Sequence, residues 1–156
     1  MNSKANSKNS IFENLKFPMH FVGVAGVGMS AIAQYLGFKG CVVTGSDRRF
    51  GQEEQTQDEV LLAKANIECF AQDASVFESK NPPQTLVLST AIEESNVELI
   101  RAKENGISIL HRSEILAELV KASNTIAVAG TSGKSTTVGM IFHILKACGF
   151  EPSVMT

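Results

Sequence analysis

The residues with the most specific chemistry form a glycine-rich segment near the carboxyl end of the chain, Gly130-Thr-Ser-Gly-Lys-Ser-Thr136. It follows a short apolar run and precedes a helical pattern, which is the context that a phosphate-binding P-loop requires. In such a loop, backbone N–H groups surround phosphate oxygens and the lysine neutralises the β- and γ-phosphates. A hydroxyl of Ser135 or Thr136 would complete a Mg²⁺ shell. The long form of the motif has glycine where this chain has Val128, so the pattern is the shorter G-x-x-G-K-[ST].

A second glycine cluster, Gly23-Val-Ala-Gly-Val-Gly-Met-Ser30, follows the first apolar run of the chain. Glycines permit a tight turn after a strand, and the helix that follows offers its positive end to an anion. The spacing is G-x-x-G-x-G, whereas dinucleotide-binding folds carry G-x-G-x-x-G. The cluster therefore predicts a phosphate site, with close packing of strand against helix as the alternative.

Polar residues also follow three other predicted strands. Asp47 could accept a hydrogen bond from a ribose hydroxyl or a base, or it could be an ordinary turn residue. The hydroxyls of Ser89-Thr90-Ala91 could touch a ligand or belong to a simple turn. Arg112 could bind a phosphate or form a surface salt bridge. Glu93 and Glu94 are interpreted as solvated surface, and the three histidines, at positions 20, 111 and 143, as structural.

Strand and helix patterns alternate along the chain and must position these residues. Apolar runs predict strands at 20–25, 41–44, 67–70, 85–89, 107–110 and 125–129. Helices are expected after position 28 and at 59–65, 74–79, 95–105, 113–120 and 134–148. Met29, Ile32, Ala33 and Leu36 would share one buried helical face. Ser95 and Glu98 suggest a capping box, and Ser113 suggests a helix cap.

This alternation predicts an α/β fold with a Rossmann-like, doubly wound and mainly parallel sheet. Ligands of such sheets lie outside the carboxyl ends of the strands. We expect a mobile tail at 1–17, the sheet domain at 18–122 and, at 123–156, the first strand, P-loop and helix of an incomplete ATP-binding domain.

Composition narrows the function classes. The net charge is -2 and no basic stripe is present, which argues against a nucleic-acid partner. The apolar runs are strand-sized and the first ten residues are polar, so neither a membrane span nor a signal peptide is expected. Three scattered cysteines, at 41, 69 and 148, suit a reducing cytoplasm.

Taken together, the blocks HFVGVAGVGMSAIAQYL, VTGSD, LSTAI, SNVELIRAKENGI, HRSEILAEL and AVAGTSGKSTT resemble the Mur ligases, in order and in spacing. The resemblance covers nearly everything from His20 onward and is strongest to the branch that joins L-alanine to UDP-N-acetylmuramate. It implies a bacterial cytoplasmic enzyme of peptidoglycan synthesis with three domains. ATP would phosphorylate the sugar carboxylate to an acyl phosphate, which an amine attacks to give an amide.

The resemblance also implies roles for individual residues. The UDP-sugar would contact Gly26, Val27, Gly28, Met29, Ser30, Asp47, Ser89, Thr90, Ala91 and Arg112. ATP and Mg²⁺ would be held by Gly130, Thr131, Ser132, Gly133, Lys134, Ser135 and Thr136, with Lys134 stabilising the transferring phosphoryl group.

Some positions depart from the family pattern. Ala25 and Ala31 replace usual glycines. Ser132 stands where the alanine-adding and tripeptide-adding members usually carry histidine and other Mur ligases often carry asparagine, so the amino acid added stays open. The amino-acid domain would be absent, and we expect the chain alone to be inactive as a ligase. The alternatives are a ligase that recycles murein tripeptide, a non-catalytic UDP-sugar-binding module and an NAD-binding oxidoreductase domain.

Overall fold

The computed structural model describes residues 12 and 14–155 of the chain. By its internal contacts the chain divides into two compact units, Met1–Ala122 and Ser123–Thr156. Each unit is described by itself.

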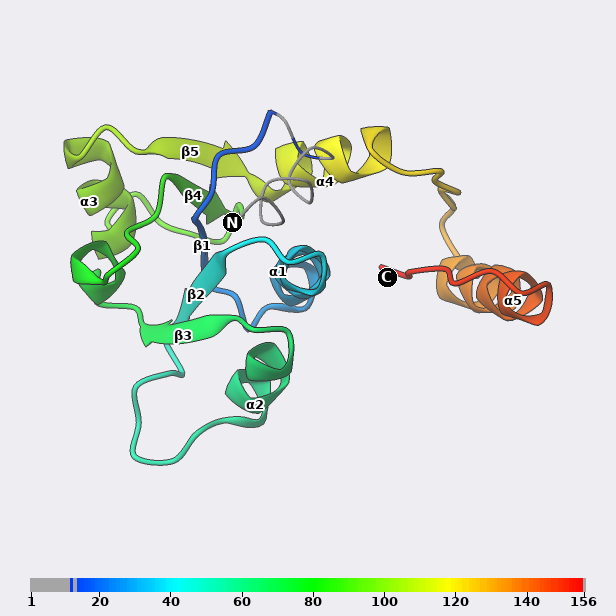
Figure 1. Ribbon diagram of the computed structural model, residues 1–156, viewed down its shortest axis with the longest axis horizontal. Helices are drawn as coiled ribbons and strands as arrows, with labels where there is room; N and C mark the ends of the chain where they lie inside the picture. Colours follow the sequence, from blue (N-terminus) through cyan, green and yellow to red (C-terminus); the bar gives the residue numbers. More distant parts are fainter. Residues whose placement is uncertain (1–11, 13, 156) are drawn as a thin grey trace, which may run out of the picture. The chain divides into compact units, whose positions relative to one another are not determined.

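The first unit is built on a five-stranded sheet in which all neighbouring strands are parallel (Figure 1). The strand order is β3-β2-β1-β4-β5. The strands are β1 (Met19–Val22), β2 (Val43–Asp47), β3 (Glu68–Ala71), β4 (Thr85–Leu88) and β5 (Ser108–His111). Because β1 lies between β2 and β4, the chain reverses its winding direction beside β1. The predicted Rossmann-like α/β fold is confirmed.

Helices separate the strands, as the alternation predicted. They are α1 (Val27–Phe38), α2 (Gln57–Lys64), the 3-10 helix η2 (Ser75–Glu78), α3 (Val97–Glu104) and α4 (Arg112–Lys121). α1 packs against α4. The predicted inner face of α1 is confirmed, because Met29, Ile32, Ala33 and Leu36 are all buried. α3 covers part of one sheet face, where its Leu99 and Ala102 cluster with Val22 and Leu86 of the strands.

Two strands differ from the prediction by two residues or more at an end, and the other three agree with it to within one residue. β1 ends at Val22 and not at residue 25, because Gly23 has a φ of 74° and turns the chain out of the sheet. β2 covers Val43–Asp47 in place of 41–44, so that Gly45 lies inside the strand. A Cβ at Gly45 would collide with the Val24 side chain. The missing side chain therefore lets the first glycine loop approach β2 closely.

The predicted helix caps were wrong by one or two residues. Asn96, not Ser95, caps α3, and its Oδ1 accepts hydrogen bonds from the N–H groups of Glu98 and Leu99. His111, not Ser113, caps α4, in a reciprocal arrangement with Glu114. In both cases the side chain that precedes the first helical residue satisfies orphan donors of the first turn.

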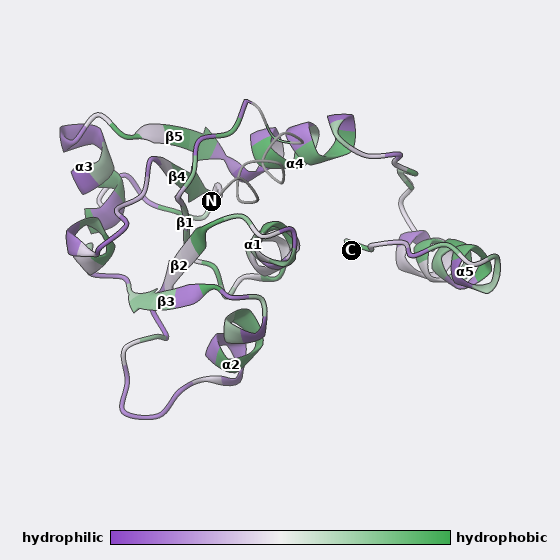
Figure 2. Cartoon of the chain, in the orientation of Figure 1, coloured by the Kyte–Doolittle hydropathy of each residue, from purple (hydrophilic) through white to green (hydrophobic). Residues whose placement is uncertain are grey.

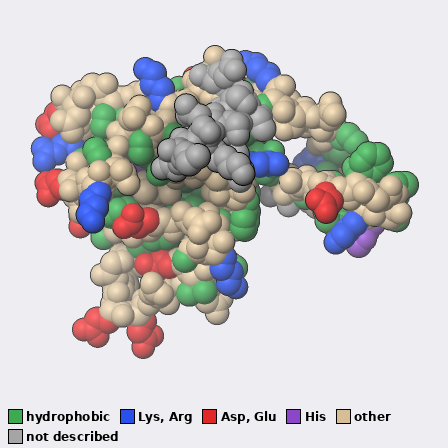
Figure 3. Space-filling model, viewed as in Figure 1, with side chains coloured by type: hydrophobic (Ala, Val, Ile, Leu, Met, Phe, Trp, Pro, Cys, Tyr) green, Lys and Arg blue, Asp and Glu red, His purple; other side chains and the backbone are tan. Residues whose placement is uncertain are grey.

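Three shorter segments also differ. The expected helix at 74–79 is only the 3-10 turn η2. The Gln- and Glu-rich composition of residues 50–58 predicts an exposed loop, and acidic side chains do show on its surface (Figure 3), but Phe50 is buried. Of the expected tail, residues 1–11 and 13 lie outside the described residues, whereas Phe12 and Leu15 are buried. Apolar contact thus holds these two residues where composition suggested mobility.

The second unit consists of α5 (Lys134–Ala147) and segments without regular secondary structure on either side of it. The helix is confirmed, but the strand expected at 125–129 is not formed, and the described part of this unit contains no strand. A strand requires a neighbour to satisfy its backbone groups, and none is present within the unit. α5 buries no residue, and its Met140 and Ile144 are exposed. Hydrophobic residues make up much of this helix (Figure 2).

No helix among the described residues is long and apolar enough to cross a bilayer.

Candidate functional site

The first glycine loop connects β1 to α1 at the carboxyl edge of the sheet. The N–H groups of Gly23 and Val24 donate to the carbonyl oxygen of Ser46, at 2.8 and 2.9 Å. The next N–H, that of Ala25, donates to Asp47 Oδ2 at 3.2 Å. Three successive amides of the loop are therefore anchored to the end of β2, which fixes the path of the chain into α1.

The amino end of α1 carries the features of an anion site. Its cap residue Gly26 supplies no side-chain hydrogen bond, and its first turn contains no acidic residue. The Gly26 carbonyl accepts from Met29 and Ser30. The N–H groups of Val27 and Gly28 have no acceptor within the helix because they belong to its first turn. These two amides and the helix dipole favour a negatively charged group at this point.

Arg112 adds a positive charge at the same place. It is the first residue of α4, directly after β5, and its guanidinium lies against Gly28. A Cβ at Gly28 would collide with Arg112 Nη1. A helix terminus and an arginine fork, which the sequence separates widely, thus face one small region of the rim, a combination suited to phosphate oxygens.

Asp47 ends β2 beside this loop. It is partly buried, and besides accepting from Ala25 it accepts at Oδ1 from the N–H and Nε of Arg49, at 3.1 and 3.2 Å. Arg49 also pairs with Asp58 at 3.1 Å. These contacts agree with the interpretation of Asp47 as a turn residue. The carboxylate also lies at the carboxyl edge of the sheet, the edge at which ligands of such sheets bind.

The segment after β4 reaches the same rim. The Ile92 N–H donates to the Ser89 carbonyl at 3.1 Å, which closes a turn. Ile92 Cδ1 would lie 3.4 Å from a Cβ built on Gly23, so this turn packs against the glycine loop. Thr90 and Ala91 are exposed at its tip. The segment 89–91 therefore lies at the same edge of the sheet as the glycine loop, to which Asp47 is hydrogen-bonded and against which Arg112 lies.

The predicted P-loop lies entirely in the second unit. Gly133 caps α5 with a φ of 75°, a conformation that favours glycine. Lys134 Nζ donates to the Gly130 carbonyl at 2.7 Å, and Thr137 Oγ1 donates to the Gly133 carbonyl at 2.9 Å. Thr131, Ser132, Ser135 and Thr136 are exposed. Hydroxyl groups that could contribute to a Mg²⁺ shell are therefore accessible, while Glu151 is the only carboxylate residue in the sequence of this unit.

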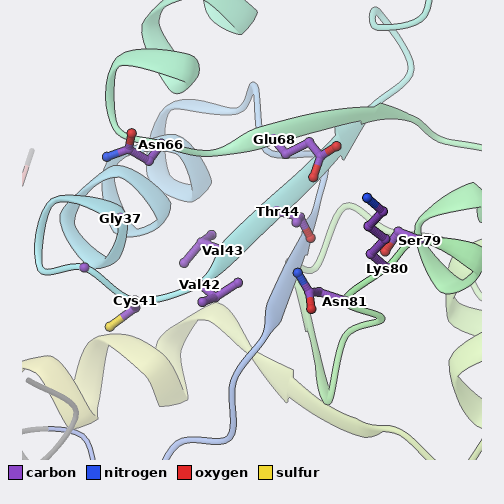
Figure 4. A pocket seen from close by; sticks show the side chains of 11 residues that line it. Gly37, Cys41, Val42, Val43, Thr44, Asn66, Glu68, Ser79, Lys80 and Asn81 are labelled. Carbon is purple, nitrogen blue, oxygen red and sulfur yellow. The ribbon is translucent and has the colours of Figure 1, made fainter. Parts of the chain in front are cut away.

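A separate hollow of about 750 Å³ lies at the opposite, amino-terminal edge of the sheet (Figure 4). Thr44, Glu68 and Lys80 border it, together with the segment that follows α1. It contains none of the predicted site residues. Since ligands of open parallel sheets bind at the carboxyl edge, the hollow is not part of the candidate site.

The cysteines do not contribute a nucleophile to the site. Burial, with the carboxylates of Glu59 and Glu68 as smaller causes, raises the pKa of the Cys69 thiol to about 11. Burial also raises the pKa of Cys41. Both thiols therefore stay protonated near neutral pH, which lowers their reactivity.

Sequence reasoning missed a group of buried polar residues in the first unit. Glu98 was interpreted as part of a capping box and His20 only as structural, and both side chains are completely buried. A signal was available, because Glu98 lies four residues before the apolar Ala102 and therefore on the inner stripe of its helix.

A parallel sheet whose central strand ends in a glycine-rich turn, with an arginine facing the next helix, defines a Rossmann-like α/β domain. Residues 18–124 match the family described as "Mur ligase family, catalytic domain". The chain belongs to the Mur ligase family.

Individual relatives agree with this assignment. The chain is 43% identical over 137 residues to a UDP-N-acetylmuramate–L-alanine ligase of Wolbachia pipientis, covering 87% of this chain and 26% of the relative. It is 39% identical over 141 residues to the enzyme of that name from Thermosynechococcus vestitus, covering 88% and 29%. The chain thus spans between a quarter and a third of the length of these relatives.

Solved structures give the same picture. The crystal structure of UDP-N-acetylmuramate–alanine ligase from Thermotoga maritima matches with a TM-score of 0.72 and 31% identity, covering 87% of this chain and 30% of that one. A murein peptide ligase from Psychrobacter arcticus matches with a TM-score of 0.73 and 25% identity, covering 84% and 26%.

Proposed function

We propose that this chain supplies the UDP-sugar-binding domain and the ATP-binding loop of an ATP-dependent ligase that joins an amino acid, L-alanine, to UDP-N-acetylmuramate. Membership of the Mur ligase family and the names of the relatives support the proposal. In this proposal residues 18–122 bind the sugar nucleotide and residues 123–156 begin the ATP-binding domain. The reaction would belong to cytoplasmic peptidoglycan synthesis, and the chain alone would not complete it.

The observation that carries the proposal is the position of Arg112 against Gly28 at the uncapped start of α1. The diphosphate of the sugar nucleotide would lie there, on the amides of Val27 and Gly28, with Met29 and Ser30 in the same helical turn. The arginine would neutralise charge that the helix end alone balances only in part.

The remaining rim residues would select the rest of the ligand. Asp47 would face the uridine, and the turn formed by Ser89, Thr90 and Ala91 would line the same pocket. Both lie beside the anchored glycine loop, so the diphosphate and the uridine would be bound by neighbouring strand ends.

ATP would bind to the loop Gly130–Thr136. Lys134 would leave the Gly130 carbonyl and contact the β- and γ-phosphates. Mg²⁺, which neutralises phosphate charge when it is bound, would take Ser135 or Thr136 as a hydroxyl ligand. The γ-phosphoryl group of ATP would pass to the sugar carboxylate, giving an acyl phosphate and releasing ADP. The incoming amine would attack the acyl carbon, displace inorganic phosphate and lose a proton to give the amide.

The test is a calorimetric titration of the 156-residue chain with UDP-N-acetylmuramate, with UDP and, separately, with Mg·ATP. We expect the sugar nucleotide and UDP to bind the wild-type chain, and Arg112→Ala to weaken both by roughly tenfold or more. The matched control is Arg101→Ala, since Arg101 is a half-exposed arginine on α3 whose partners are Glu78 and Glu104.

Three outcomes would contradict the proposal. If neither UDP nor its sugar conjugate binds, the rim residues do not form the proposed site. If the two arginine variants behave alike, the diphosphate lies elsewhere. If a nicotinamide dinucleotide binds and the UDP-sugar does not, an oxidoreductase domain replaces the ligase.

A further inference from the structure

Four polar side chains are buried on the two strands that flank the glycine loop and on α3. They are His20 of β1, Thr44 and Ser46 of β2, and Glu98 of α3. His20, Ser46 and Glu98 are completely inaccessible. None of them reaches the rim, and the proposed ligand contacts do not use them.

The four side chains form one connected group. Ser46 Oγ donates a hydrogen bond of 2.5 Å to Glu98 Oε2. Glu98 Oε1 lies 3.3 Å from His20 Nε2, and His20 Nδ1 lies 2.7 Å from Thr44 Oγ1. Glu98 is the member that joins β2 to β1, because its two carboxylate oxygens face side chains on different strands.

Stability alone is a weak reason for such a group. Removing a carboxylate from water is costly, and well-packed apolar replacements of buried ion pairs are often as stable or more stable. The position of Glu98 is nonetheless firmly set, because Asn96 Oδ1 accepts hydrogen bonds from the N–H groups of Glu98 and Leu99. A fixed buried carboxylate is well suited to orient the groups bonded to it.

Ser46 links this carboxylate to the candidate site. Its hydroxyl donates to Glu98, while its carbonyl oxygen accepts from both Gly23 and Val24. Asp47, the next residue, accepts from Ala25. Ser46 is therefore bonded to Glu98 through its side chain and to the glycine loop through its main chain.

We propose that Glu98 is a positioning residue for the phosphate-binding loop: through Ser46 it fixes the end of β2, and so the direction of the Val27 and Gly28 amides at the start of α1. The inference deepens the proposed function and rests on it for its effect on ligands. The predicted effect of Glu98 on the alignment of the loop backbone does not depend on which ligand binds.

The proposal predicts a selective defect. Glu98→Leu removes the acceptor and keeps a side chain of similar size, so the loop amides lose their alignment while the uridine side of the rim is unchanged. We expect the Kd of UDP to rise about tenfold and that of uridine to change less than about twofold. Ser46→Ala should give the same selectivity, and the double variant should be no worse than the stronger single variant.

Two further variants separate positioning from packing. Glu98→Gln keeps an oxygen acceptor for Ser46 and offers an amide to His20, so we expect it to restore UDP binding to within about twofold of wild type. Leu99→Ala, at the adjacent buried position of α3, should lower the melting temperature without changing the ratio of the UDP and uridine affinities. If Leu99→Ala shifts that ratio as far as Glu98→Leu does, the role is merely structural and the proposal is overturned.

The closing experiment is amide hydrogen exchange, followed by NMR on the full 156-residue chain without ligand. Exchange of the Gly23 and Val24 amides should speed up at least about tenfold in Glu98→Leu and in Ser46→Ala, but not in Glu98→Gln or Leu99→Ala. Unchanged exchange in Ser46→Ala overturns the proposal even if Glu98→Leu fails to fold. If exchange changes as expected and the wild-type chain binds no UDP, the positioning role stands and the proposed function fails.

Discussion

The two glycine-rich loops of this chain each precede a helix, but they differ in the structure that holds them. The loop at 23–26 follows a strand that is paired on both sides, and three of its amides are anchored to β2. The loop at 130–133 follows a segment that forms no strand. The side chains of Lys134 and Thr137 donate hydrogen bonds to carbonyl oxygens of the loop itself. A glycine motif can therefore form its local turn without a sheet, but only a sheet fixes its direction relative to distant residues.

The largest expected difference between the two units is in packing energy. Phe21 is completely buried in β1, whereas Ile144 of α5 is 63% exposed. Phe21→Ala should lower the free energy of unfolding of the first unit by about 3–5 kcal/mol. Ile144→Ala should change the free energy of unfolding by less than about 0.5 kcal/mol. Urea unfolding followed by circular dichroism measures both, and a large cost at Ile144 would show that α5 is packed in solution.

The second-largest expected difference between the two units is in the reactivity of their cysteine thiols. The raised pKa of Cys69, about 11 against an ordinary value of 9.0, keeps its thiol protonated at pH 8 and lowers its thiolate fraction about a hundredfold. Cys148 of the second unit is exposed. At pH 8 a maleimide should label Cys148 first, and the rate of labelling of Cys69 should keep rising with pH up to about 11. Peptide mass mapping identifies the order, and early modification of Cys69 would contradict its burial.

A glycine-to-alanine substitution in each of the helices α1 and α5 should also have different effects. Gly28→Ala would push the Arg112 guanidinium away from the start of α1, so UDP affinity should fall roughly tenfold with little change in stability. Gly139→Ala of α5 meets no atom within 4 Å and should stabilise its helix by up to about 1 kcal/mol. Calorimetry and helix melting provide the two readings. Full UDP affinity in Gly28→Ala would remove the diphosphate from this position.

The smallest expected effect concerns the helix caps. Asn96→Ala removes two hydrogen bonds from the first turn of α3 and should cost about 1 kcal/mol. Ser132→Ala precedes the glycine cap of α5, which has no side-chain hydrogen bond, and should stay within about 0.5 kcal/mol of wild type. Thermal unfolding compares them. Equal losses would mean that Ser132 caps α5 in solution.

Local patterns were sufficient for most of the first unit. The alternation of apolar runs and helical stripes predicted the α/β fold, and the periodicity of Met29, Ile32, Ala33 and Leu36 predicted the buried face of α1. Boundaries were less accurate, because Asn96 adjoins Ser95, another good capping residue, and because His111 caps α4 although serine is the more usual cap. Pairing with β1 and β3 carries β2 through Gly45 to Asp47, which its own apolar run did not indicate.

The sequence by itself determined which residues could bind phosphate, because glycine spacing, a following helix and the lysine at position 134 are local features. It also determined the family. Only the tertiary structure decided that Arg112 meets Gly28, that Asp47 accepts from the Ala25 amide, and that Glu98 is hydrogen-bonded to Ser46. These contacts join residues far apart in the chain, and the order of the strands in the sheet, which no local pattern specifies, decides which strand ends are neighbours.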